Sequence, residues 1–156
     1  MNNKIRVNCH NKSALRHHAG QSLVEFALIL PLFVLFLIGV FELGRAFFSY
    51  IAITNAAREG ARVVTFWSDK ATVLNVINAV EDEIGSSPMV DAGNIDSIVI
   101  ECGNTPMDVV NSDAELRACP ADLPIRVTVT YEFIPILEFF FSDPLLLRRS
   151  AEMMVP

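Results

Sequence analysis

A run of sixteen uncharged residues, Phe26–Phe41, limits what this 156-residue chain can fold into more than any other feature. Glu25 and Glu42 bound the run, which consists almost entirely of large apolar residues. At about 1.5 Å per residue the run forms a helix of about 24 Å, whereas the hydrocarbon core of a bilayer is about 30 Å thick. The run therefore predicts a short membrane-spanning helix, with Glu25 paired or reaching toward the interface.

The twenty residues before Gln21 have a different character. They carry four Lys and Arg residues and all three histidines of the chain, but no acidic residue. A basic segment next to a membrane helix remains in the cytoplasm. A secretory signal is cut at small residues after its apolar region, whereas here the small residues Ala19 and Gly20 come before it. Cleavage after Gly20 would remove the basic leader and leave the membrane helix on the mature protein.

Glu25 is a candidate functional residue, because an acid in a membrane segment is unfavourable by about 3 kcal/mol on insertion scales. After cleavage, the new α-amine of Gln21 and the carboxylate of Glu25 would lie one helical turn apart on the same face. The amine would neutralise Glu25 of its own subunit, or that of a neighbour during assembly. In the alternative, Glu25 only marks the membrane–water interface and faces the lipid headgroups, and the spacing alone favours neither interpretation.

The helical pattern continues beyond this run and predicts one long helix over residues 21–65, membrane-embedded over about 23–41. Pro31 lies inside the embedded part and removes a backbone hydrogen bond, which usually bends a helix. Membrane helices tolerate proline where neighbouring groups satisfy the freed carbonyl. The residues assigned to the membrane include Phe26, Pro31, Gly39 and Phe41.

Past the membrane, small residues recur at every fourth position of the same helix: Ala52, Ala56 and Gly60. This spacing lets helix backbones approach closely. Their packing partner is either the protein's own sheet or another subunit. Glu42 and Arg45 lie one turn apart, which predicts a solvated or loosely paired face.

Residues 66–156 predict a small extracytoplasmic α+β domain with an antiparallel sheet. Apolar residues at helical spacing predict a second helix over residues 71–84. Strand composition predicts strands at Ile95–Cys102 and Ile125–Ile134, and a last strand within Leu147–Val155.

The segment Phe133–Pro144 is rich in aromatic residues and leucine around Glu138. If it is exposed, it forms a contact patch for a partner or for the membrane surface. If it is buried, it belongs to the core. We expect burial against the long helix.

The cysteines fit an external domain. Cys9 leaves with the leader, and Cys102 and Cys119 flank the loop between two predicted strands. An oxidising exterior would allow a disulfide that closes this loop. Two cysteines with no histidine nearby do not form a zinc site, so we expect no metal.

Composition also bears on catalysis and on partners. Because every histidine lies in the leader, no Ser-His-Asp or Cys-His arrangement remains after cleavage, and no nucleotide or metalloprotease motif is present. Catalysis by a pair of carboxylates is not excluded, although nothing in the sequence singles out one pair.

The processed chain has eight Lys and Arg and eighteen Asp and Glu, a net charge of −10. Such a domain repels phosphate backbones, so we expect no enzyme, no cofactor and no nucleic acid.

The stretch from Gly20 to Arg62 resembles the TadE-like family of minor pilins, or pseudopilins, in the tight-adherence (Tad, or Flp-type) branch of type IV pili. The resemblance covers the N-terminal part of the chain well and the remainder only in general organisation. The matching features are the Gly20/Glu25 junction, Glu25-Phe26-Ala27, Leu30-Pro31, Glu42-Leu43-Gly44-Arg45 and Ala56-Ala57-Arg58-Glu59-Gly60-Ala61-Arg62.

The resemblance implies a type IV pilin-like fold, in which a long N-terminal transmembrane helix precedes a small domain with an antiparallel sheet and a second helix. It implies removal of residues 1–20 by a prepilin peptidase that cuts between Gly20 and Gln21. It also implies a single-pass protein of the cytoplasmic membrane with its C-terminal domain outside. The expected partners are the peptidase, other pilin subunits, the Tad assembly platform and membrane lipid. The expected role is priming, capping or building the shaft of a pilus used for surface adhesion.

A permanently anchored single-pass protein is the main alternative. Such a protein would keep its leader, and its external domain would bind a ligand or belong to a secretion apparatus. A small extracytoplasmic enzyme is a third class, which the missing nucleophile–base pairs disfavour.

Overall fold

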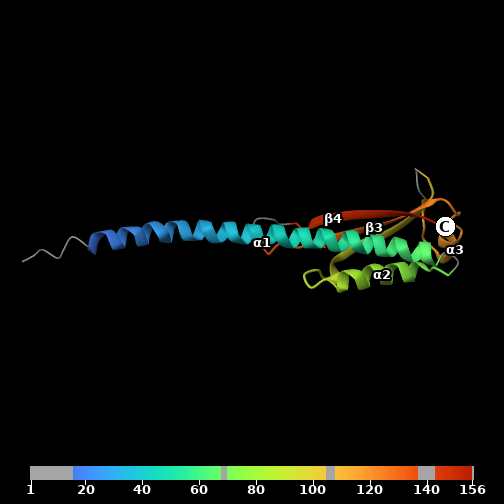
Figure 1. The fold of residues 1–156 in the computed structure, drawn as a ribbon, viewed down its shortest axis with the longest axis horizontal. Coiled ribbons are helices and arrows are strands. Elements are labelled where there is room, and N and C mark those ends of the chain that lie inside the picture. The colour runs from blue at the N-terminus through green and yellow to red at the C-terminus, as the bar shows by residue number, and fades with distance from the viewer. Residues whose placement is uncertain (1–15, 68–69, 105–107, 137–142, 156) are drawn as a thin grey trace, which may run out of the picture. The chain divides into compact units, whose positions relative to one another are not determined.

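The computed structural model of the chain describes residues 16–67, 70–104, 108–136 and 143–155. The chain divides into two compact units, Met1–Phe41 and Glu42–Pro156. The fold is α+β: a long N-terminal apolar helix precedes a small domain with a four-stranded antiparallel sheet and a second helix (Figure 1). The fold class expected from the sequence is thereby confirmed.

Helix α1 (Arg16–Phe66) contributes residues to both units. It starts before Gly20, so the expected junction between leader and mature chain lies inside the helix. Pro31 is accommodated within the helix and does not end it. In the first unit, every residue from Gly20 to Leu37 is exposed.

The sheet of the second unit has the strand order β2-β1-β3-β4, with every neighbouring pair antiparallel. Strand β1 (Ile95–Cys102) has the bounds expected from its composition, and β3 (Pro124–Phe133) is shifted by one residue from the expected range. Strand β4 (Leu145–Met154) begins two residues before the expected range, and β2 (Asp108–Val109) is a two-residue edge strand.

Helix α2 (Val73–Gly85) lies close to the range expected from its apolar spacing. Thr72 caps it, because its hydroxyl accepts a hydrogen bond from the backbone N–H of Asn75 over 3.1 Å. Two short helices complete the unit: η1 (Ala92–Asn94) before β1, and α3 (Asp113–Arg117) in the loop that precedes β3.

The core of the second unit lies between the helices and one face of the sheet. Alternate residues of β3, such as Val127 and Val129, are fully buried, which matches the period of two expected for a strand with one buried face. Val76, Val80 and Ile84 of α2 are fully buried as well. Along α1 the buried positions recur at helical spacing: Ser49, Ala52, Ile53, Ala56, Ala57, Ala61 and Val64.

Candidate functional site

The junction proposed for processing is a helical segment in this structure. The side-chain amide of Gln21 donates a hydrogen bond to Oε1 of Glu25 over 3.3 Å, and both side chains are exposed. The two residues therefore share one face of α1, one turn apart, as their spacing predicts. In a chain cut after Gly20, the α-amine of Gln21 would sit at the start of this turn.

Gly20 itself is not required by the fold. A Cβ atom built on it would meet no heavy atom within 4 Å, so alanine would fit at this position. Alanine also favours a helix by about 1 kcal/mol over glycine. Any need for glycine here would therefore come from another molecule that binds this segment.

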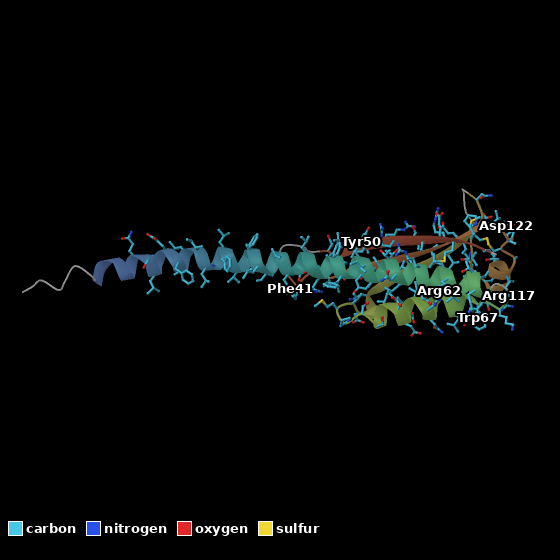
Figure 2. All side chains as sticks on the ribbon, in the orientation of Figure 1. Phe41, Tyr50, Arg62, Trp67, Arg117 and Asp122 are labelled. Carbon is cyan, nitrogen blue, oxygen red and sulfur yellow. A yellow bond between two sulfur atoms is a disulfide. The ribbon has the colours of Figure 1, made fainter. Side chains whose placement is uncertain are left out.

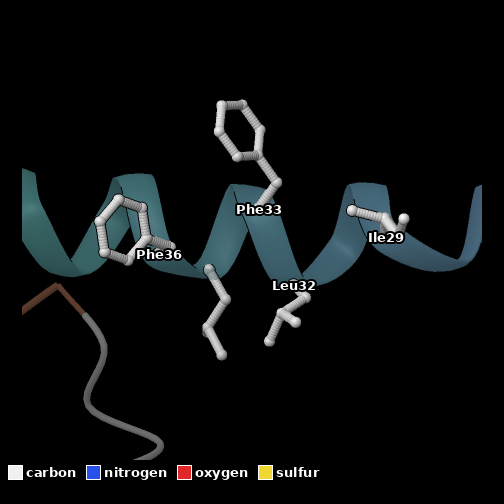
Figure 3. A pocket seen from close by; sticks show the side chains of 5 residues that line it. Ile29, Leu32, Phe33 and Phe36 are labelled. Atoms are coloured by element: carbon white, nitrogen blue, oxygen red, sulfur yellow. The ribbon is translucent and has the colours of Figure 1, made fainter. Parts of the chain in front are cut away.

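The apolar part of α1 is long and apolar enough to cross a membrane, and none of its most apolar window is buried. Phe26, Pro31, Gly39 and Phe41 are all exposed. The side chains of Ile29, Leu32, Phe33 and Phe36 project outward from successive turns (Figure 3), so this apolar region is an open surface of a helix. Burying such a surface in water-free surroundings is strongly favourable.

The small residues of α1 pack inside the second unit. Ala56 is fully buried and Ala52 is 6% exposed. A Cβ atom on Gly60 would lie 2.8 Å from Cγ2 of Val80 and 3.3 Å from Cγ1 of Val127. The absence of a side chain at Gly60 thus lets α1 approach α2 and β3 together, and these positions contact the protein's own domain.

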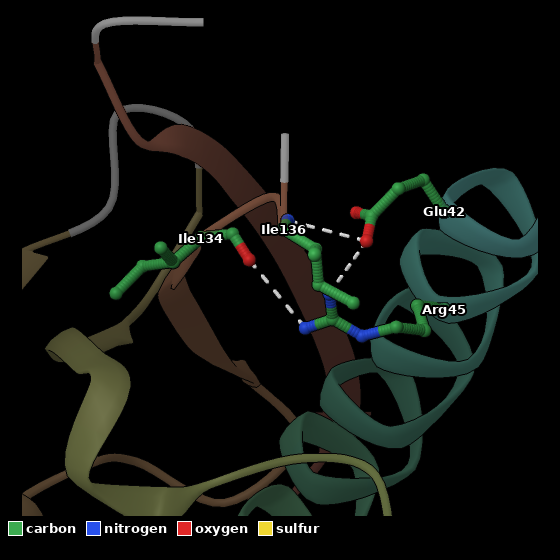
Figure 4. A network of polar contacts seen from close by, with 4 residues as sticks. All are labelled: Glu42, Arg45, Ile134 and Ile136. Atoms are coloured by element: carbon green, nitrogen blue, oxygen red, sulfur yellow. Dashed lines mark hydrogen bonds and ion pairs between the residues drawn. The ribbon is translucent and has the colours of Figure 1, made fainter. Parts of the chain in front are cut away.

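Glu42 and Arg45 form an ion pair, but the pair is mostly buried and is not the solvated or loosely paired face expected from the sequence, which is a correction. Their side chains are 13% and 23% exposed, and Nη1 of Arg45 lies 2.9 Å from Oε1 of Glu42. The same Oε1 accepts a hydrogen bond from the backbone N–H of Ile136 over 3.2 Å, and Arg45 donates to the carbonyl of Ile134 over 3.4 Å (Figure 4). The Arg45 guanidinium also lies 5.1 Å from the ring centroid of Phe133.

This cluster ties the start of the second unit to the chain that follows β3. Oε2 of Glu42 is buried and has no hydrogen-bond partner among the residues that the structure describes. A sequence signal for the cluster exists: Glu42, Arg45, Ser49 and Ala52 follow one another at helical spacing and so share the buried face of α1.

The described residues of the aromatic-rich segment are only partly buried, whereas burial was expected. Phe133 is 5% exposed, but Ile134 and Ile136 expose 45% and 60% of their surface. Residues 137–142 of this segment lie outside the described residues.

Cys102 and Cys119 are joined by a disulfide, with their Cα atoms 6.0 Å apart (Figure 2). The bridge closes a loop of 17 residues that contains β2 and α3. Cys102 is the last residue of β1, so the bridge anchors this loop to the sheet.

The charged groups of the second unit form ion pairs at its surface. Hydrogen bonds from Arg62 hold the pKa of Glu59 below its ordinary value. Arg126 pairs with Glu152 and Glu101 on neighbouring strands, and the hydrogen bond to Glu152 raises the pKa of Arg126. In the described parts of the chain, no three His, Cys, Asp or Glu residues are grouped as a metal site would require.

These features fit a single-pass membrane protein with an α+β domain attached to its anchoring helix. Residues 20–62 match the model of a protein family described as TadE-like protein, which agrees with the resemblance seen in the sequence. The match contains Gly20, Glu25 and most of α1. No curated protein and no solved structure matches the chain.

Proposed function

We propose that the chain is a minor pilin of a Tad-type pilus, cut between Gly20 and Gln21 and held in the cytoplasmic membrane by α1 until assembly. This proposal rests on one observation, the sequence of features along helix α1. One helix runs from a basic leader, through the Gln21–Glu25 pair and an exposed apolar surface, into a folded domain.

The chemistry of the junction supports a role in assembly. After cleavage, the N-terminus of α1 would combine the partial positive charge of the helix end with the α-amine of Gln21. Glu25 lies one turn away and provides the opposite charge. In the membrane or in a filament this pair would remove the penalty of an isolated carboxylate.

The exposed surface of the first unit supports storage followed by assembly. Its apolar side chains, which include Leu28, Leu32 and Phe36, are 75%, 69% and 65% exposed. Lipid would cover them in the membrane, and the helices of neighbouring subunits would cover them in a pilus. The second unit keeps its own core in both settings and would supply the contacts specific to this subunit.

The proposal is tested by asking whether variants are cut and whether they enter pili. Gly20→Ala should stay uncut and be absent from sheared pili, although the structure has room for alanine there. Glu25→Gln should be cut normally but enter pili at a much lower level, because it lacks the charge that pairs with the amine. Gly85→Ala is a matched control, since a Cβ there also meets open space, in the external domain.

Immunoblots of membranes and of sheared pili measure both steps. Uncut wild-type chain in cells that contain the peptidase would contradict the proposal and identify a permanently anchored protein. Normal cutting and normal pilus levels of Glu25→Gln would contradict the role given to Glu25.

A further inference from the structure

An exposed apolar surface lies at the base of the second unit, where α1 enters it. On α1, Leu43, Phe47 and Phe48 are 74%, 63% and 57% exposed. Ile51, one turn further on, is 40% exposed. These residues follow the predicted membrane span directly along the helix.

The segments that flank the β3–β4 connection add to this surface. Ile134 and Ile136 follow β3, and Leu145 begins β4; all three are exposed. The Glu42–Arg45 cluster bonds to the backbone of Ile134 and Ile136 and so holds them beside the start of this part of α1 (Figure 4). We call the combined set the basal surface: Leu43, Phe47, Phe48, Ile51, Ile134, Ile136 and Leu145.

The part of this surface that α1 contributes carries no exposed charged side chain. Between Phe26 and Ala57, α1 contains two charged residues, Glu42 and Arg45. Both are mostly buried and bind each other and the backbone of the β3–β4 connection. The outward side of α1 therefore stays uncharged from Phe26 to Ile51, well past the residue at which the sequence alone places the end of the span.

The uncharged side of α1 from Phe26 to Ile51 matches the thickness of a bilayer better than the predicted span Phe26–Phe41 does. The run Phe26–Phe41 is about 24 Å long, which is shorter than a hydrocarbon core of about 30 Å. The side from Phe26 to Ile51 is about 39 Å long by the same rise, close to the 40–45 Å of a bilayer with its headgroups.

We propose that the basal surface sits in the interfacial layer of the bilayer, so that lipid covers it and the external domain rests in the membrane surface. The polar and aromatic side chains beside the basal surface are of the kinds found in the headgroup layer. The ring of Tyr50 lies 4.3 Å from the Arg149 guanidinium, and aromatic rings and arginines are common at the headgroup level. Asp143 is exposed next to Leu145, where a carboxylate requires the headgroup layer and not the hydrocarbon.

This inference rests on the membrane anchoring in the proposed function, and it is independent of cleavage and of pilus assembly. Its distinctive claim concerns Ile136, which is far from α1 in sequence and would contact lipid only if the domain itself is seated in the membrane.

Because the chain contains a single tryptophan, Trp67, tryptophan fluorescence can report on one chosen position at a time once Trp67 is replaced. In a Trp67→Phe background, four full-length variants place one tryptophan each: Phe33→Trp in the span, Phe47→Trp and Ile136→Trp on the basal surface, and Phe66→Trp as control. Phe66 is 77% exposed on the same helix, about 29 Å beyond Phe47. Each protein is reconstituted in phosphatidylcholine vesicles, with and without acyl chains brominated near the headgroup.

We expect the bromolipid to quench most of the emission at positions 33, 47 and 136, and to leave position 66 unchanged with water-like emission. Quenching at 33 and 47 without quenching at 136 would overturn the seated domain while leaving the anchor intact. A blue-shifted but unquenched signal at 47 and 136 would show that protein covers the surface, which also overturns the proposal. An unquenched position 33 would overturn the membrane anchor and this inference together.

Discussion

Gly60 occupies a position on α1 with no room for a larger residue. A Cβ atom there would come within 2.8 Å of Val80, a stiff β-branched residue that is itself fully buried. Overpacking of this kind is unfavourable by about 1–3 kcal/mol, and the better helix propensity of alanine returns about 1 kcal/mol.

We therefore expect Gly60→Ala to lower the free energy of unfolding by about 1 kcal/mol. Gly44→Ala is the matched control on the same helix, because a Cβ there meets nothing within 4 Å, and it should be neutral or stabilising. Urea unfolding of the full chain in detergent micelles measures both. Equal stability of the two variants would contradict the close packing of α1 against α2 and β3.

The Glu42–Arg45 cluster is a second place where we expect a single substitution to change the stability of the second unit. Arg45→Met keeps most of the side-chain volume but leaves the mostly buried Glu42 carboxylate without its cation. We expect this change to lower the free energy of unfolding by about 2 kcal/mol.

The double variant Glu42→Gln/Arg45→Met should be more stable than Arg45→Met alone, because the uncompensated charge is gone. A double-mutant cycle on urea unfolding gives the coupling, expected to be at least about 0.5 kcal/mol. Additive single effects would show that the two side chains do not stabilise each other.

At the scale of elements, α1 and β4 are joined by Arg149. Its guanidinium lies over the Tyr50 ring, and Nε donates to the Thr54 hydroxyl over 3.4 Å. Arg148 is exposed, and its position in the strand places it on the opposite face of the sheet. Arg149 thus packs against α1, whereas Arg148, the preceding residue, is exposed on the other face of the sheet.

We expect Arg149→Met to lower the free energy of unfolding by about 1 kcal/mol, the value typical of a partly buried cation–π contact. Arg148→Met should change it by less than about 0.5 kcal/mol. Thermal unfolding followed by near-ultraviolet circular dichroism compares them. A larger effect at Arg148 would contradict the assignment of the two faces.

The disulfide stabilises the loop between β1 and β3. In the chain-entropy model a bridge that closes 17 residues contributes about 3 kcal/mol. We expect Cys102→Ser/Cys119→Ser to lose about that amount of unfolding free energy, and reduction of the wild type to have a similar effect. Unchanged stability after reduction would show that the loop is held by its other contacts.

The elements with strong local signals could be predicted from the sequence. The strand β1 has the expected bounds, and α2 and β3 lie within two residues of theirs. The short elements β2, η1 and α3 could not be predicted, because two to five residues carry too little periodicity. The backbone partners of Glu42 and Arg45 could not be predicted either, since Ile136 and Ile134 lie 94 and 89 residues away from them in sequence.

At the scale of the whole molecule, one helix serves two environments. From Phe26 to Leu37 its side chains are exposed and apolar all round, whereas in the second unit one stripe that includes small residues is buried against α2 and the sheet. The change in pattern occurs at Glu42, whose Oε1 binds Arg45 and the backbone N–H of Ile136 within the second unit. In the function we propose, such a subunit would keep its folded domain while the apolar helix exchanges lipid for other helices.

The central claim is that the chain is cut between Gly20 and Gln21, since every step proposed for assembly depends on the new α-amine. Intact-mass and N-terminal peptide mass spectrometry of the protein, expressed with and without a Tad-type prepilin peptidase, tests this claim directly. We expect an N-terminus at Gln21 only when the peptidase is present. A full-length chain that begins at Met1 in both cases would contradict it.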